Sequence, residues 1–322
     1  MSVLASALLI SACQPKDNKA KDEQEIDLSS ASEPQQQILT LKGETEPVPF
    51  NLPGCSGNSC PEFSIDRLHT NQFVLDELVD QAIMQHLKQM LEMTDQAKKD
   101  NNQKDEKVTA DQSQSSSEVA LNLTPAQLLG QRVQPYVDRF IDLDKELKTL
   151  GASHQISLSI SPKILNSQEP LATVVLNTSS YLGGAHGSSS QTYFNFDLKH
   201  QKQVHLDQIL LPNQKEKLSN LAHEAFKAWI IELKLADNVE EYEQAWKFSL
   251  TNNFYLGKQG LILQYGEYEI GPYVVGLPRI TIPYEKLQGI VKPEYLPAEL
   301  NQVVTNANDV QSKNQPENKT KS

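Results

Sequence analysis

The sequence predicts an α+β fold in which helices pack on one face of a sheet. Two kinds of spacing support this class, because apolar residues recur every three or four positions in some stretches and every second position in others. A glycine-rich turn between two alternating stretches also indicates a hairpin. The 322 residues include 29 Lys and Arg against 41 Asp and Glu, a formal charge of −12. A nucleic-acid-binding protein needs a basic face, so we expect no nucleic acid as partner.

Residues 1–12 form a short apolar run that ends in small residues just before Cys13. A membrane-spanning helix needs about 20 apolar residues, so the run predicts a signal peptide instead. Ile10-Ser11-Ala12-Cys13 fits the bacterial lipobox, and we expect a lipid such as palmitate on the Cys13 thiol. The alternative is an exposed N-terminal cysteine on a soluble protein.

Two further residues near this signal bear on export and location. No Lys or Arg precedes Lys16, although secretory signals normally open with one, so we expect the natural start a few codons upstream. The residue directly after the lipidation cysteine is Gln14 and not an aspartate. Resemblance to enteric lipoproteins therefore implies sorting to the periplasmic face of the outer membrane.

The other two cysteines, Cys55 and Cys60, enclose only Ser-Gly-Asn-Ser. These small and turn-forming residues allow the tight reversal that a disulfide requires. The bridge would contribute about 2 kcal/mol and would persist in an oxidising periplasm. Zinc is the competing interpretation, but a second ligand pair at suitable spacing is missing, so we expect no metal. The sequence also shows no phosphate loop or glycine-rich dinucleotide fingerprint, so we expect no cofactor.

Composition divides the chain into stretches that differ in their capacity to fold. Polar runs without aromatic residues cannot bury enough surface to offset the entropy of ordering. The division predicts a signal peptide (1–12), a lipid-attached disordered tether (13–47) and an α/β segment with the Cys loop (50–93). A disordered linker (94–120), an α+β domain (121–300) and a disordered tail (301–322) follow.

The first folded segment and the helix after the linker follow from local patterns. The segment is predicted to contain a strand at Glu62–Leu68 and then a helix whose apolar face comprises Leu75, Leu78, Val79, Ala82, Ile83, Leu87 and Met90. Thr124-Pro125-Ala126-Gln127 has the pattern of a capping box and predicts a second helix that ends before Gly151. Pro135 lies inside that helix, and we expect a kink or break near Gln134.

Beyond Gly151 the pattern changes to alternation and predicts a sheet with one long helix. That helix, over Gln214–Leu233, should cover one sheet face. The strands are expected near 156–160, 173–181, 191–198, 254–256, 261–265 and 279–283, with a turn at Gly183–Gly187 and a short helical piece at 284–288.

Several ordered pieces of this second half resemble the RsiV-like extracellular domain family. The resemblance is strong over about 150–296 and weaker over 50–92. The pieces that carry it are Tyr181–His186, Tyr193–Leu198, Val204–Leu210, Phe254–Leu256, Gly260–Leu263, Tyr268–Gly276 and Ile280–Tyr284.

This resemblance implies an extracytoplasmic α+β domain with an antiparallel sheet. The family's domain occurs in an anti-sigma factor that binds lysozyme, beside deacetylase domains in some cell-wall enzymes, and in lipoproteins. The anti-sigma role requires a cytosolic segment and an internal transmembrane helix, which this sequence does not show. The deacetylase role requires a His-x-x-x-His pair, whereas His200 with His205 and His69 with His86 have other spacings.

Five residues are candidates for a functional site. His186 lies in the glycine turn. Either its imidazole contacts a ligand, or the turn only forms the tight connection of a hairpin. Tyr268 and Tyr273 would anchor a protein or glycan, or lie in the core. Glu267 and Glu269 would share one strand face as a paired acid and base, or form a solvated face. Ser188–Ser190 is expected to be a polar turn.

Two functional hypotheses follow. The first is a lipid-anchored binding module of the cell envelope whose partner, by analogy to the family, is a lysozyme-like protein or peptidoglycan. Its acidic charge suits a basic lysozyme. The alternative is an envelope hydrolase or deacetylase that uses Glu267, Glu269 and His186, which would have to converge in one pocket.

Overall fold

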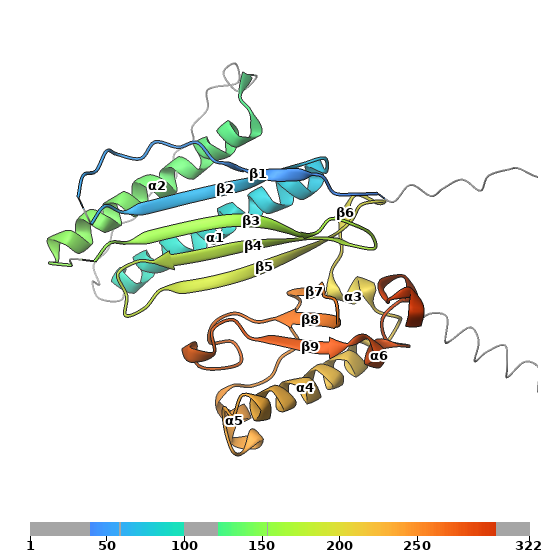
Figure 1. The fold of residues 1–322 in the computed structure, drawn as a ribbon. Helices are drawn as coiled ribbons and strands as arrows, with labels where there is room; N and C mark the ends of the chain where they lie inside the picture. Colours follow the sequence, from blue (N-terminus) through green and yellow to red (C-terminus); the bar gives the residue numbers. More distant parts are fainter. Residues whose placement is uncertain (1–38, 58, 100–121, 153, 301–322) are drawn as a thin grey trace, which may run out of the picture. The chain divides into compact units, whose positions relative to one another are not determined.

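The computed structural model describes residues 39–57, 59–99, 122–152 and 154–300, and it has a mixed α+β fold (Figure 1). The predictions for the signal peptide, the lipid on Cys13, most of the tether, the linker from residue 100 and the tail all lie outside these residues. Within the described part of the chain, no helix is both long and apolar enough to cross a membrane.

Six strands form one sheet in the order β1-β2-β3-β4-β5-β6. They span Gly43–Pro47, Glu62–Thr70, Ser157–Asn166, Ala172–Tyr181, Ser188–Asp197 and Lys202–Gln203. Neighbours are antiparallel, as expected, except that β2 and β3 are parallel. Two helices connect β2 to β3, and such a crossover returns the chain to the starting end of the sheet.

The edge strand β1 corrects the predicted tether, which extended through residue 47. Its residues Gly43–Pro47 pair with β2. The sequence pattern did not reveal this strand because it lacks apolar alternation and is held mainly by backbone hydrogen bonds. Glu46 also pairs with Arg67 of β2 at 2.8 Å.

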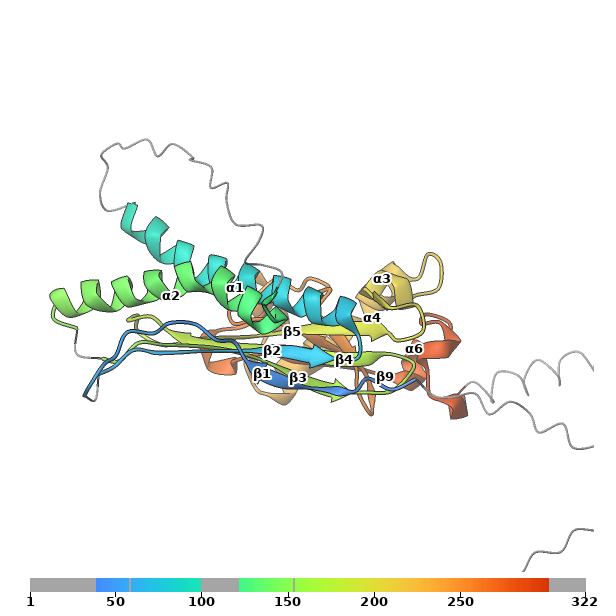
Figure 2. The same cartoon turned by 90° about the horizontal axis from the view of Figure 1, so that it is seen from above.

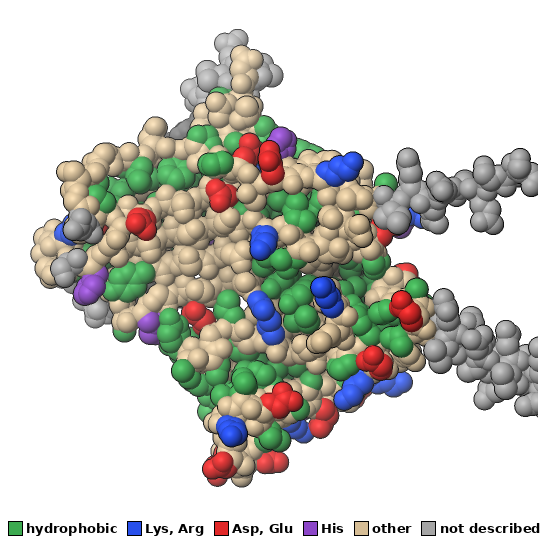
Figure 3. All heavy atoms as spheres, viewed as in Figure 1, with side chains coloured by type: hydrophobic (Ala, Val, Ile, Leu, Met, Phe, Trp, Pro, Cys, Tyr) green, Lys and Arg blue, Asp and Glu red, His purple; other side chains and the backbone are tan. Residues whose placement is uncertain are grey.

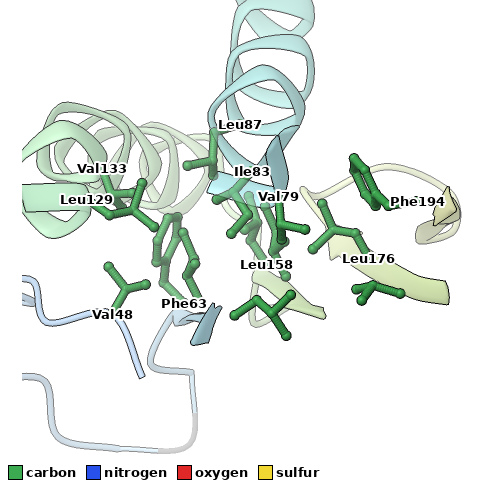
Figure 4. Close-up of a cluster of buried hydrophobic side chains, with 14 of the residues drawn as sticks. Val48, Phe63, Val79, Ile83, Leu87, Leu129, Val133, Leu158, Leu176 and Phe194 are labelled. Carbon is green, nitrogen blue, oxygen red and sulfur yellow. The ribbon is translucent and has the colours of Figure 1, made fainter. Parts of the chain in front are cut away.

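Two long helices, α1 (Phe73–Lys99) and α2 (Pro125–Thr149), cover one face of this sheet (Figure 2). The core between these helices and the sheet is built from alternate strand residues and from one stripe of apolar residues on each helix. Figure 4 shows part of it, with Val79, Ile83, Leu87, Leu129 and Val133 from the helices and Phe63, Leu158, Leu176 and Phe194 from the strands.

The first helix is longer than predicted, and the second has the predicted capping box and continues past its internal proline. The first continues to Lys99, six residues into the predicted linker, because Thr94–Lys99 contains neither proline nor glycine to end it. The capping box at Thr124 is confirmed, but α2 runs through Pro135 without a break. Pro135 and Gln131, whose carbonyl loses its helical partner, are both exposed, so water can satisfy that carbonyl.

A second sheet of three antiparallel strands has the order β7-β8-β9, over Phe254–Leu256, Gly260–Gln264 and Arg279–Pro283. Helix α4 (Lys215–Glu232) packs on one face of it through Leu218, Ala222, Phe226 and Ile230, as predicted. The smaller elements are α3 (Leu206–Ile209), α5 (Val239–Ala245), η2 (Tyr273–Val275), α6 (Tyr284–Leu287) and η3 (Pro293–Tyr295).

A buried ion pair fixes α1 against β2. The Arg67 guanidinium donates from Nη2 to the Asp80 carboxylate at 2.8 Å, and both side chains are almost fully buried. Ser161 reaches Asp66 on the opposite face at 2.9 Å. Arg67 thus has carboxylates on two elements as charge partners, which offsets the cost of burying its charge.

We predict that acid weakens this fold through His86. Its imidazole lies between α1 and β5, within 3.2 Å of the Thr192 hydroxyl, and burial lowers its pKa below the ordinary value. The unfolded chain therefore binds this proton more readily than the folded chain, so stability falls as pH drops through the unfolded pKa of about 6.5. Urea midpoints measured between pH 7.5 and 5.5 should decrease in the wild type and change less in His86→Gln. Exposed Gln85→Ala is the control and should keep the wild-type slope, and an equal slope in His86→Gln would contradict the assignment.

Candidate functional site

The loop between β4 and β5 presents His186 to solvent. Gly183 adopts a φ of 87°, and a Cβ on Gly187 would lie 2.9 Å from the Ser180 carbonyl oxygen. Glycine is therefore required for the chain to fold back at this point. The predicted hairpin is confirmed, but Ser188–Ser190 belong to β5 and do not form a turn. Their hydroxyl side chains suit a solvated strand as well as a turn.

The loop between β8 and β9 brings two tyrosines to this histidine. The Tyr268 hydroxyl lies 2.9 Å from His186 Nε2, and the Tyr273 ring stacks on the imidazole with centroids 3.9 Å apart. Tyr273 also donates from its hydroxyl to the Gly187 carbonyl at 3.1 Å. We call His186, Tyr268 and Tyr273 the Tyr–His cluster. The structure therefore brings together the three residues selected as ligand-binding candidates.

The cluster is preformed and exposed. Tyr268 is 49% exposed and Tyr273 37%, and the neighbouring Val274 is 87% exposed, so the core interpretation of the two tyrosines does not apply. Tyr268 has a φ of 62°, a conformation that non-glycine residues rarely adopt. Gly271 packs so closely on the Tyr242 hydroxyl that a Cβ would lie 2.7 Å from it. These contacts fix the loop, so the rings are held in place before any ligand binds.

The two carboxylates of the catalytic hypothesis are engaged elsewhere. Glu267 accepts hydrogen bonds from the Ser188 hydroxyl at 3.0 Å and the Ser189 backbone N–H at 2.9 Å. Glu269 accepts one from the Gly266 backbone N–H at 2.7 Å. Both lie in a turn and not on a strand, and the described residues contain no hydrogen bond between either carboxylate and His186. The geometry therefore does not assemble these three residues as an acid–base site.

Sequence reasoning missed the residues that join the two sheets. Asn253, just before β7, accepts from the Tyr193 backbone N–H at 2.9 Å and donates to the Gln191 carbonyl at 2.7 Å. Asn195 of β5 is buried and donates to the Phe254 carbonyl at 2.7 Å. The only local signal was an Asn-Asn pair before a short strand. Together these bonds attach β7 to β5 and set where the tyrosine loop lies.

The remaining sequence predictions concern the Cys loop and metal binding. Cys55 and Cys60 form a disulfide, with their Cα atoms 5.8 Å apart. Among the described residues, no group of three or more His, Cys, Asp or Glu side chains is placed to hold a metal ion.

Comparison with known proteins gives a partial family match. Residues 207–285 match the model of a family described as a protein of unknown function, DUF3298. The chain is also 25% identical over 157 residues to the peptidoglycan-N-acetylmuramic acid deacetylase PdaC of Bacillus subtilis (strain 168). That match covers 47% of this chain and 33% of PdaC, so the chain spans about a third of the length of that relative.

Two crystal structures of DUF3298 family proteins have a similar fold. The protein from Pseudomonas aeruginosa PAO1 gives a TM-score of 0.53 at 27% identity, over 81% of this chain and 97% of that one. The protein from Bacteroides fragilis NCTC 9343 gives 0.52 at 21% identity, over 80% and 95%. The second likeness, at this identity, shows the fold alone.

We predict that Asn253→Ala weakens the junction between the sheets. The change leaves the Tyr193 N–H and the Gln191 carbonyl without their partner, and each unpaired group costs about 1–3 kcal/mol where water cannot replace it. Urea denaturation should therefore show a loss of about 2–3 kcal/mol. The adjacent Asn252 is exposed, and Asn252→Ala should stay within about 0.5 kcal/mol of the wild type. Equal stability of the two variants would show that Asn253 does not hold the sheets together.

Proposed function

We propose that this protein is a lipid-anchored binding module of the cell envelope, of the RsiV-like type, and that it holds cell-wall glycan. Its partial similarity to PdaC supports an envelope setting, because PdaC is named for acting on peptidoglycan. The match to DUF3298 and the two related crystal structures support a shared domain, without a named activity.

The Tyr–His cluster is the observation that carries the proposal. It offers two exposed phenol rings and an imidazole on loops that are already tied to each other. Aromatic rings present a flat apolar face with a polar hydroxyl tip, which suits the C–H faces and hydroxyl groups of a sugar. A preformed surface also avoids much of the entropy cost of ordering side chains on binding.

A lysozyme-like protein is the competing ligand. The charge of −12 favours encounter with a basic protein, but long-range attraction of this kind is not specific to one site. Exposed tyrosines with a neighbouring valine also suit a protein hot spot. The salt dependence of binding separates non-specific charge attraction from binding through the aromatic rings, because screening weakens charge attraction far more than stacking.

The proposed anchor is a lipid on Cys13, followed by a polar segment that leads to the folded part. This arrangement would place the module on the periplasmic face of the outer membrane. The lipobox and Gln14 support this proposal.

We predict that Tyr273→Ala weakens glycan binding by about tenfold, which corresponds to about 1.4 kcal/mol. The measurement is calorimetric titration of the unlipidated full chain, Cys13→Ser, with soluble peptidoglycan fragments and with a basic lysozyme at low and near-physiological salt. Tyr273→Phe keeps the stacking on His186 and should bind within about threefold of the wild type. Ile231→Ala, exposed on α4, is the control.

The same titration can contradict the proposal in two ways. If Tyr273→Ala bound peptidoglycan fragments with wild-type affinity, the Tyr–His cluster would not be part of the binding surface. Saturable lysozyme binding that survives salt and requires Tyr273, without glycan binding, would assign a protein ligand instead.

We predict that Cys13→Ser moves the protein from the membrane fraction to the soluble fraction. The thiol is the atom that would receive the lipid, so its removal eliminates palmitate labelling. Cell fractionation and labelling with radioactive palmitate check this outcome. Cys55→Ser with Cys60→Ser is the matched control and should stay membrane-bound and labelled. Membrane retention of Cys13→Ser would contradict the lipid anchor.

A further inference from the structure

The faces of the two sheets that are turned away from α1, α2 and α4 meet at β5 and β7. On the six-stranded sheet, Lys163, Val175 and Tyr193 lie opposite one another on neighbouring strands. On the three-stranded sheet, Tyr255 lies opposite Ile262. The Tyr193 and Tyr255 rings stack with centroids 4.4 Å apart and planes 11° from parallel, which makes the two faces continuous.

Arg279 of β9 lies beside this stack and is held by two carboxamides. Its Nε donates to Gln264 Oε1 and its Nη2 to Gln191 Oε1, both at 2.8 Å. Gln264 is only 1% exposed, and its amide nitrogen donates to the carbonyls of Tyr265 and Pro278. Its oxygen must therefore face Arg279, so the orientation of the guanidinium is built into the buried structure.

The charge of Arg279 is not neutralised by these partners. Arg67 and Arg139 both pair with carboxylates, whereas the partners of Arg279, two amides and the Tyr193 hydroxyl, are uncharged. No carboxylate among the described residues forms an ion pair with Arg279. Because a guanidinium has five N–H donors, further donors remain for a ligand.

The surroundings of Arg279 are also cationic and polar. Figure 3 shows Lys and Arg side chains near the centre of this face, beside a broad area with few charged groups over β2–β5. Lys163 is exposed on the same face, two strands from Tyr193, or about 10 Å at the usual strand spacing. Small hydroxyl and amide side chains fill the area, including Ser159, Ser161, Asn177, Ser179 and Gln191.

We propose that Arg279, assisted by Lys163, binds the free carboxylate of an acidic sugar in cell-wall glycan whose lactyl groups carry no stem peptide. This inference rests on the proposed function and adds a charged subsite to it. A planar guanidinium fork matches the two oxygens of a carboxylate, and the neighbouring hydroxyl and amide groups match those of a sugar. The Tyr255 ring, which stacks on Tyr193, supplies an apolar contact for the sugar ring.

The test compares two sugars that differ in one acidic group. N-acetylmuramic acid carries a lactyl carboxylate that N-acetylglucosamine lacks. Each is titrated into the unlipidated full chain while the Arg279 Nε–H signal is followed by NMR. N-acetylmuramic acid should shift this signal saturably, and N-acetylglucosamine should not shift it at the same concentrations.

Variants assign the effect to the guanidinium. Arg279→Gln should weaken N-acetylmuramic acid binding at least tenfold, read from backbone amide shifts around Tyr255. Arg132→Gln removes an equal charge from the exposed side of α2 and should have no effect. Lys163→Gln leaves the Gln264 network intact and should weaken binding about threefold, so it serves as a second test if Arg279→Gln folds poorly.

Three results would overturn the inference. Equal shifts by both sugars would show that no acidic group is recognised. Wild-type affinity in Arg279→Gln, or in Lys163→Gln if Arg279→Gln does not fold, would remove the charged subsite. Tighter binding of N-acetylglucosamine 6-phosphate than of N-acetylmuramic acid would replace the carboxylate with a phosphate.

Failure of this subsite is distinguishable from failure of the proposed function. Co-sedimentation with insoluble peptidoglycan reports the function as a whole. If the wild type co-sediments and Tyr273→Ala does not, but N-acetylmuramic acid leaves the Arg279 signal of the wild type unshifted, the module stands and the charged subsite falls. If the wild type does not co-sediment although N-acetylmuramic acid shifts the Arg279 signal, the anion site stands and the assignment to the cell wall falls.

Discussion

The outer edge of β5 is the constraint on which the rest of the site depends. A strand edge exposes backbone N–H and C=O groups that need partners, and among the described strands only the short β6 pairs with this edge, at the end of β5. Side chains and a loop satisfy four further groups of this edge. Glu267 accepts from the Ser189 N–H, Asn253 bonds the Tyr193 N–H and the Gln191 carbonyl, and the Val204 N–H donates to the Asn195 carbonyl. These partners come from the second half of the chain, so completing the edge also attaches the three-stranded sheet to the six-stranded one.

This attachment explains why the Tyr–His cluster exists as a unit. Glu267 precedes Tyr268 in the chain, so a carboxylate that completes the edge of β5 also delivers a phenol ring to His186. The same residue that suggests catalysis in the sequence thus has a positioning role in the structure. The glycine turn allows the hairpin to approach, and the bond from Tyr273 to Gly187 links the loops again. The proposed binding surface and the sheet junction are therefore built from the same contacts.

Charge is used in two different ways in this fold. Arg67 is buried against carboxylates of α1 and β1, where its charge is needed to compensate Asp80 and Glu46. Arg279 is exposed and is oriented by neutral amides, so its charge remains available at the surface. The net charge of −12 hides this difference, because it reports the sum and not the distribution. A cationic position on an acidic protein favours a local anion without general attraction to acidic polymers.

Local patterns in the sequence determined most helices and strands, the hairpin turn, the α2 capping box and the Cys55–Cys60 bridge, because each depends on residues that are close in the chain. The sequence also selected His186, Tyr268 and Tyr273, but not their convergence. Only the tertiary structure decided the parallel pairing of β2 with β3, the edge strand β1 and the roles of Asn253 and Arg279. These features join segments tens of residues apart: 82 positions separate His186 from Tyr268, and 88 separate Gln191 from Arg279. Such pairings satisfy backbone and charged groups across the fold, and spacing along the chain carries no record of them.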